Sequence, residues 1–238
     1  MKPKTAAGLL GLAFENGDIE GFELACSLQP WAKESCSPLR LIEQHLAQAK
    51  ASRATKVADA RVFVQPYLSA LAQYGYPATG PNLSGLRNAD GASLIFYAGE
   101  ALKYSGDHKH HALLLHRMVE RNPTPPKCIK QLISMGFDKD FQDQGGNTPL
   151  HAVFNAMKKT QKPEKAHEYL IRVQALQQAG ADFTLKNKAG VSAGDAISGI
   201  LSGFAGYPEF CELLSSIQAQ LLTANTPTVA SRAPSRRL

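Results

Sequence analysis

GFDKDFQDQGGNTPLHAVF at residues 136–154 and GADFTLKNKAGVSAGDAI at residues 180–197 are two copies of one pattern. The first glycine of each copy recurs after 44 residues, and so does a second glycine that stands ten residues further on. Self-similarity at a fixed period predicts a chain built from stacked structural units, each of which buries its apolar face against its neighbours.

Within each copy the residue types predict where helices begin and end. Thr148 is a suitable N-cap because its hydroxyl can accept a hydrogen bond from a free backbone N–H group. Pro149 follows at the position where a helix tolerates proline. Gly136 and Gly180 can each adopt the left-handed conformation that ends a helix. Each unit is therefore predicted to consist of a helix, a loop, a second helix and a turn.

Thr148-Pro149-Leu150-His151 resembles the T-P-L-H-x-A signature of the ankyrin repeat, a helical unit of about 33 residues. Val153 stands where the family prefers alanine. The resemblance implies that His151 hydrogen-bonds the backbone of the neighbouring turn. The period found here exceeds the family period by about 11 residues, and insertions in repeat proteins lie in loops. We expect this insertion in the polar run from Met157 to Glu168.

Weaker matches extend the pattern toward both ends of the chain. Residues 90–98 align with the same signature and are expected to open a unit that runs to Gly136. That unit has room for an additional helix at residues 111–121. Residues 13–22 resemble the centre of an amino-terminal capping repeat, and residues 208–222 have the apolar spacing of a closing helix.

Two further amphipathic helices, at residues 38–50 and 61–74, fit a degenerate second unit. The sequence thus predicts an all-α fold, an ankyrin-repeat solenoid of about five helix-turn-helix units with irregular insertions. This domain is expected to span residues 1–223. Residues 224–238 contain few apolar residues and two prolines, and we expect them to form a flexible basic tail.

Composition limits the classes of partner. The formal net charge is +6, but Arg232, Arg236 and Arg237 contribute three of these charges from the last seven residues. The remaining chain is only mildly basic and lacks the clustered basic and aromatic residues of a nucleic-acid surface, so we expect no nucleic-acid partner. No stretch approaches the roughly 20 apolar residues of a membrane span, so we expect no membrane partner.

The cysteines and the first residues bear on localisation. Lys2 and Lys4 precede an apolar run that imitates a signal peptide, but Glu15 and Asp18 close the run and no clean cleavage site follows. We expect a cytoplasmic protein, with secretion into a host cell or the periplasm as the alternative. The four cysteines form no CxxC pair, which favours free thiols in a reducing compartment: Cys26, Cys36, Cys128 and Cys211.

Gly190-Val191-Ser192-Ala193-Gly194 fits the G-x-S-x-G pattern of a serine-hydrolase elbow. That fold requires a histidine after the nucleophile, and no histidine follows His167. A catalytic triad in another chain order could use His167, Asp182 and Ser192, but the sequence predicts no rigid sheet to hold these three side chains together. In the repeat register Ser192 occupies the place of the capping threonine. We therefore expect no catalytic residue and no enzymatic activity.

The histidines of residues 108–111, together with His116, resemble the ligands of a metal-binding site. Their spacing does not suit one face of a helix, Lys109 lies among them, and no cysteine or carboxylate stands at ligand spacing. We expect an exposed connector here, no metal site and no cofactor.

The resemblance implies a non-catalytic module that binds another protein through a concave face made by the turns and the first helices of the units. The insertions at residues 106–116 and 157–168 could add a second contact surface. Transferred position by position, the candidate partner-binding residues are Ala89, Asp90, Ala92, Glu100, Gln142, Gln144, Asn147, Asn155, Lys186, Lys188 and Val191.

Two functions remain open at this point. The first is an adaptor, or an inhibitor that neutralises a partner enzyme, with the protein monomeric when free. The alternative is a secreted bacterial effector whose repeats engage a host protein and whose basic tail aids delivery. Because the sequence holds no clear secretion signal, we expect the first.

Overall fold

The computed structural model describes residues 6–28, 38–52, 54–76, 80–107, 109–120, 125–160, 163–204 and 208–224. Within these residues the chain forms thirteen helices and a single isolated bridge between Lys186 and Ser192. The expectation of an all-α fold is confirmed. The predicted tail after residue 224 lies outside the described residues. None of the described helices is long and apolar enough to cross a membrane.

The helices follow one another through short connections. In chain order they are α1 (Ala6–Glu15), α2 (Ile19–Leu28), α3 (Pro38–Ser52), α4 (Ala54–Gln73), α5 (Gly80–Ala89), α6 (Gly91–Lys103), α7 (Lys109–Ala112), α8 (Leu114–Glu120), α9 (Pro126–Ser134), α10 (Pro149–Lys159), α11 (Pro163–Gln178), α12 (Ala193–Gly203) and α13 (Pro208–Ala224).

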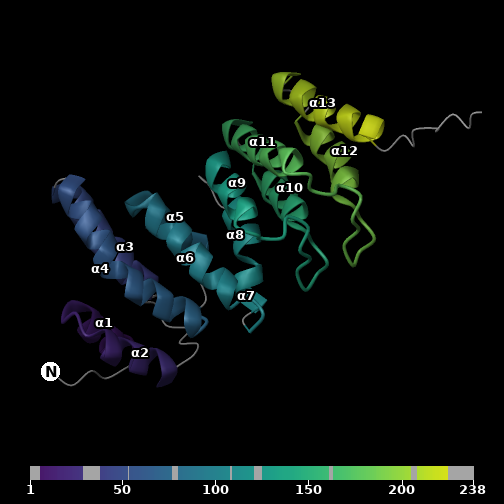
Figure 1. Ribbon diagram of the computed structural model, residues 1–238. Coiled ribbons are helices and arrows are strands. Elements are labelled where there is room, and N and C mark those ends of the chain that lie inside the picture. Colours follow the sequence, from purple (N-terminus) through teal and green to yellow (C-terminus); the bar gives the residue numbers. More distant parts are fainter. Residues whose placement is uncertain are drawn as a thin grey trace, which may run out of the picture.

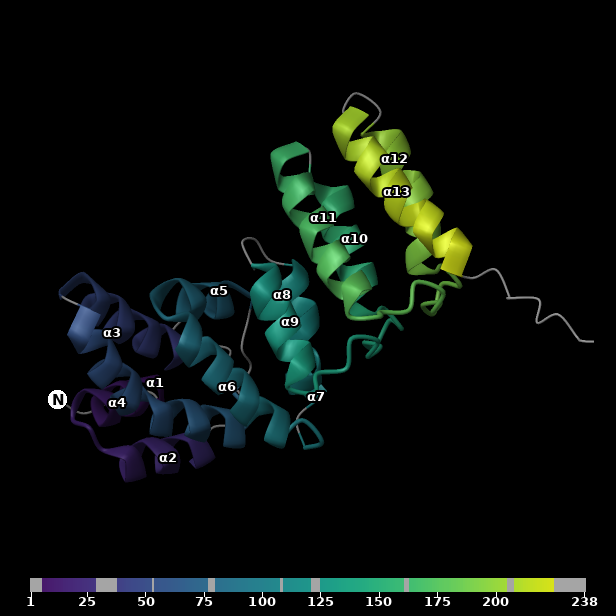
Figure 2. The ribbon, with the colours of Figure 1, turned by 45° about the horizontal axis from the view of Figure 1, so that its top comes forward.

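Twelve of these helices form six consecutive pairs, which stack from one end of the molecule to the other (Figure 1). The first row contains α1, α3, α5, α8, α10 and α12, and the second contains α2, α4, α6, α9, α11 and α13. The short helix α7 leads into α8. Figure 2 shows the same stack from a second direction. Each pair buries its apolar side chains on the next, and one apolar core extends from Leu10 to Ile217.

The expected unit that opens at residue 90 is wrong in two respects. Asp90 caps α6, which is the second helix of a pair whose first helix is α5. The additional helix expected at residues 111–121 is present as α8, but it is the first helix of a separate pair with α9, and residue 121 lies outside the described residues. Leu114, Leu115 and Met118 are buried where α8 packs on its neighbours. The described residues therefore form six pairs and not about five.

The expected loop at residues 157–168 is also wrong. Residues 157–159 belong to α10, and residues 163–168 belong to α11. Met157 of α10 and Ala166 of α11 are fully buried. Both ends of the expected loop therefore lie in helices that contribute to the apolar core.

The predicted helix boundaries in the strongest repeats are confirmed. Helix α10 has Thr148 as its N-cap and Pro149 at its first position. Gly136 and Gly180 follow α9 and α11 with φ angles of 106° and 78°. Both φ values lie in the left-handed region that glycine adopts without steric cost, which explains why the helices end there.

A buried arginine joins α11 to α8. Arg172 is 1% exposed, its Nη1 donates to the carbonyl of Val119 at 2.9 Å, and its guanidinium stacks on the Tyr169 ring. The Tyr169 hydroxyl donates to the carbonyl of Glu120 at 3.1 Å. These bonds satisfy carbonyls of the last turn of α8, which have no partner within the helix, and place a cation at the negative end of its dipole.

Candidate functional site

Two long turns project beside each other between the helix pairs, at residues 137–148 and 181–192, and Figure 1 shows both as loops that extend beyond the helices. Each turn is shaped by one polar side chain. Asp143 accepts hydrogen bonds from the backbone N–H groups of Gly145 and Asn147, both at 2.8 Å. Asn187 accepts from the corresponding groups of the second turn, at 3.0 and 3.1 Å. The two copies of the sequence pattern thus form the same local structure.

The charge on Asp143 is stabilised inside its turn. Partial burial disfavours the ionised form, but hydrogen bonds from Asn147 and Gly145 outweigh this effect and hold the pKa of Asp143 below its ordinary value. The carboxylate therefore remains ionised and keeps accepting hydrogen bonds across the neutral pH range.

Hydrogen bonds link the first turn directly to the second. The backbone N–H of Lys188 donates to the carbonyl of Gly145 at 2.9 Å, and Asn187 Nδ2 donates to Asn147 Oδ1 at 3.0 Å. Gln142 Nε2 donates to the carbonyl of Lys186 at 3.0 Å. These bonds tie three residues of each turn to the other turn, so the two turns present one fixed surface.

Gly146 allows this close approach. Its φ angle is 76°, and a Cβ atom at this position would lie 2.8 Å from the backbone nitrogen of Lys188. Gly190 has nearly the same φ, 77°, but a Cβ atom there would meet nothing within 4 Å. The first glycine is thus required by both conformation and space, and the second by conformation alone.

His151 connects α10 to the second turn, as the resemblance implied. Its Nε2 lies 3.0 Å from the carbonyl oxygen of Val191, so Nε2 must carry the proton that is donated. Its Nδ1 accepts from the backbone N–H of Thr148 at 3.2 Å and lies 2.9 Å from the Thr148 hydroxyl. Both contacts fit a neutral imidazole protonated on Nε2.

His116 makes the same contact one pair earlier, and sequence reasoning missed it. Its Nε2 lies 2.9 Å from the carbonyl oxygen of Asn147, the residue before the N-cap of α10. Burial lowers the pKa of His116, so the ring stays neutral at neutral pH. The signal was present in the sequence, since Leu115-His116 stands 35 residues before Leu150-His151.

The expected exposed connector at residues 108–111 and His116 is therefore wrong where the structure describes it. His116 is 4% exposed, and His111 is 1% exposed with its Nε2 2.9 Å from the carbonyl oxygen of Ala72. His108 lies outside the described residues. Within the described part of the chain, no group of three or more His, Cys, Asp or Glu side chains is arranged to hold a metal ion. The three described cysteines, Cys26, Cys128 and Cys211, are free thiols, and Cys36 lies outside the described residues.

Ser192 is the N-cap of α12, as the repeat register predicted. Its Oγ accepts from the backbone N–H of Asp195 at 3.1 Å, and the Asp195 carboxylate accepts from the backbone N–H of Ser192 at 2.9 Å. Ser192 is 8% exposed. Asp182 accepts from the backbone N–H and the hydroxyl of Thr184. The side chains of Ser192 and Asp195 thus cap a helix, and the side chain of Asp182 shapes a turn.

The structure buries two of the predicted contact residues and places two others on the second row of helices. Ala89 and Asp90 are buried, at 5% and 9% exposure. Ala92 is exposed and Glu100 is half-buried beside Lys103, but both belong to α6 in the second row, away from the row that carries α10 and α12. These four residues were placed one helix out of register, because the signature match at residue 90 begins a second helix and not a first.

Asp90 stabilises the packing of α4 on α6. Its carboxylate accepts from Arg61 Nε and Nη2, both at 2.8 Å, and from the backbone N–H of Ser93 at 3.0 Å. The bond from Arg61 is the main reason that the pKa of Asp90 is lowered to about 2. A residue expected at a binding face therefore serves as a helix cap and as an ion-pair partner.

The other predicted contact residues lie on the paired turns and on α10. Asn147 is half-buried within the turns, where its amide bonds Asp143 and Asn187. The remaining six are exposed: Gln142, Gln144, Asn155, Lys186, Lys188 and Val191. Five of these six belong to the two turns, which the hydrogen bonds described above bring together.

Comparison with known proteins does not assign a family. No family model matches the chain, and no curated protein is significantly similar to it.

Proposed function

We propose that the chain is a degenerate ankyrin-type repeat protein that binds a partner protein through the surface of its paired turns. The observation that carries the proposal is the linkage of the two turns by Lys188, Asn187 and Gln142 at 2.9–3.0 Å. A surface fixed before binding loses little conformational entropy when the partner docks. The contact of His151 with the neighbouring turn, which the family resemblance implied, supports the repeat assignment.

The exposed side chains of the turns indicate the chemistry of the partner. Lys186 and Lys188 are exposed on the second turn, Gln142 and Gln144 on the first, and Val191 is 41% exposed. The turns also expose the carboxylates of Asp138 and Asp182, but each of these accepts hydrogen bonds from its own turn, Asp138 from the Asp140 N–H and Asp182 from Thr184. The two lysines, the two amides and Val191 therefore complement a polar protein surface that carries carboxylates around a small apolar contact. We propose that the chain acts as an adaptor or inhibitor toward such a partner.

The test is affinity capture from a native lysate with two charge-reversed proteins. The first protein carries Lys186→Glu and Lys188→Glu on the turns. The matched control carries Lys127→Glu and Lys130→Glu, which reverse two exposed charges on α9 in the second row. Because like charges across an interface cost several kcal/mol, the turn variant should lose the captured protein and the α9 variant should keep it.

A Gln144→Arg protein is the second test, because this exposed side chain can be enlarged without disturbing the bonds between the turns. Asn147 is unsuitable, since its amide holds both turns together and its replacement would change their shape. Capture that survives both the lysine reversals and Gln144→Arg would show that the turns are not the binding surface.

A further inference from the structure

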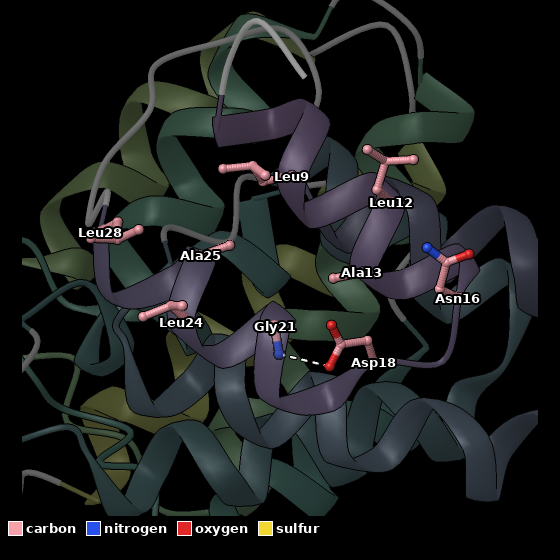
Figure 3. Close-up of a pocket in the computed structure, with 9 residues that line it drawn as sticks. All are labelled: Leu9, Leu12, Ala13, Asn16, Asp18, Gly21, Leu24, Ala25 and Leu28. Atoms are coloured by element: carbon pink, nitrogen blue, oxygen red, sulfur yellow. Dashed lines mark hydrogen bonds between the residues drawn. The ribbon is translucent and has the colours of Figure 1, made fainter. Parts of the chain in front are cut away.

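An apolar groove lies at the amino-terminal end of the stack, far from the paired turns. It has a volume of about 250 Å³ and runs between α1 and α2. Leu9 and Leu12 of α1 and Leu24 and Leu28 of α2 form its sides, as Figure 3 shows. The spacing of three residues on α1 and four on α2 places each leucine pair on one face of its helix.

These four leucines are unusually exposed for their type. Leu24 and Leu28 are 62% and 64% exposed, and Leu9 and Leu12 are 42% and 40% exposed. On the opposite side of the same two helices, Leu10, Phe14 and Phe22 are buried, in the core that α3 and α4 help to form. The pair thus has two apolar faces, only one of which is covered by the described chain. A clustered, exposed apolar face marks an interaction surface.

The floor of the groove consists of small residues. Ala13 and Ala25 are buried at its base. Gly21 of α2 also lines the groove, where the Asp18 carboxylate covers it and accepts from its backbone N–H at 2.9 Å. Small residues allow another backbone to approach closely. Elsewhere in the stack, the face of one helix pair is covered by the helices of the next pair. A helix is therefore the shape that fits this groove.

The acidic side chains near the groove indicate the charge of its partner. Residues 6–28 contain four acidic side chains and no Lys, Arg or His, although the whole chain has a net charge of +6. All four are exposed: Glu15, Asp18, Glu20 and Glu23. Asp18 lines the groove, and Glu20 precedes Leu24 by one helical turn. Asp18 and Glu20 form the acidic rim of the groove, whereas Glu15 lines a separate hollow against α3 and α4. This rim repels a second copy of the same face and an anionic membrane surface, and it attracts basic side chains.

We propose that this groove docks a basic amphipathic helix of a partner protein. Leucine-type side chains of that helix, at i, i+3, i+4 and i+7, enter between the four leucines, and its Lys and Arg side chains face the acidic rim. This surface lies on the first pair of helices and does not depend on the proposed role of the turns. The chain would then have two docking surfaces, a rigid polar one on the turns and an apolar, acid-rimmed one at its amino-terminal end.

The test uses two synthetic amphipathic peptides of about 18 residues, one with leucine and lysine and one with the same leucine pattern and glutamate in place of lysine. Binding to the full chain is followed by fluorescence anisotropy. The Leu/Lys peptide should bind, with an affinity that falls as salt is added, and the Leu/Glu peptide should not. The Leu24→Gln protein should bind the Leu/Lys peptide about tenfold more weakly, since one buried leucine contact is lost.

Val62→Gln is the matched control, because Val62 is 69% exposed on α4 and does not line the groove. Its affinity for the Leu/Lys peptide should equal that of the unchanged protein. Glu20→Lys should weaken peptide binding, and Asp59→Lys, on the exposed surface of α4, should do so less. Equal binding of both peptides, or an equal loss in the Val62→Gln protein, would overturn the proposal. So would concentration-dependent dimerisation that Leu24→Gln abolishes, or vesicle binding that Leu24→Gln abolishes.

Discussion

Replacing Asp90 by asparagine tests the conclusion that this residue is a structural link between α4 and α6. Asparagine keeps the size of the side chain and its ability to cap a helix, but it loses the charge that pairs with Arg61. The pKa of Asp90 falls from 3.8 to about 2 on folding, and each pKa unit corresponds to about 1.4 kcal/mol. This lowering of the pKa sets the scale of the lost stability. Because Arg61 is 37% exposed and solvent weakens its ion pair with Asp90, the expected loss is at most about 2 kcal/mol.

Urea unfolding at pH 7, followed by circular dichroism, measures this loss. Asp59→Asn is the control, since it removes the same charge from an exposed position on α4 and should change the stability by less than about 0.5 kcal/mol. Because the folded-state pKa is lowered, the contribution of Asp90 is fully present above about pH 4 and is lost as the pH falls toward 2. The difference between the unchanged protein and Asp90→Asn should shrink over that interval. Equal unfolding midpoints for the two asparagine variants at pH 7 would refute the reasoning.

Two further predictions concern the turns and the histidine before them. Gly146→Ala should destabilise the protein by about 2 kcal/mol or more, because it combines an unfavourable φ with a clash against the second turn. Gly190→Ala shares the strain without the clash and should cost about 1 kcal/mol; equal losses in thermal unfolding would exclude the close approach. Burial lowers the pKa of His116, so protonation opposes folding and stability should fall as the pH drops below about 6.5. His116→Gln should weaken this pH dependence, whereas His167→Gln on the surface of α11 should preserve it, and identical pH profiles for all three proteins would contradict the assignment.

Sequence patterns predicted the part of the fold that local chemistry determines. Thr148 and Pro149 start a helix, and Gly136 and Gly180 each end one, because each of these effects acts within a few residues of the chain. The paired turns could also be located, since both copies keep the same spacing between their glycines.

The sequence-based predictions that were wrong concern residues whose structure depends on tertiary packing. The signature-like start at Asp90 predicted a first helix, but α5 precedes it despite two glycines and a proline in its ten residues, and the packing of α5 on α3 and α6 holds it in place. The cluster that includes His116 resembled an exposed polar connector because the burial of an imidazole depends on carbonyl partners far away in sequence.

The amino-terminal groove could not be recognised from the sequence alone. Leucines at positions 9, 12, 24 and 28 fit an ordinary helical core pattern, and only the arrangement of α1 and α2 against α3 and α4 shows that these four remain uncovered. Which of two apolar faces is buried is a property of the assembled stack.

Site-specific photo-cross-linking in cells tests the central claim, that a partner protein binds the paired turns. A benzophenone amino acid is placed at Gln144 or Lys188 on the turns and, for comparison, at Lys130 on α9. All three side chains are exposed, so the probe should not disturb the fold. The account predicts the same protein adduct from both turn positions and none from position 130. Adducts from position 130 with none from the turns would contradict it.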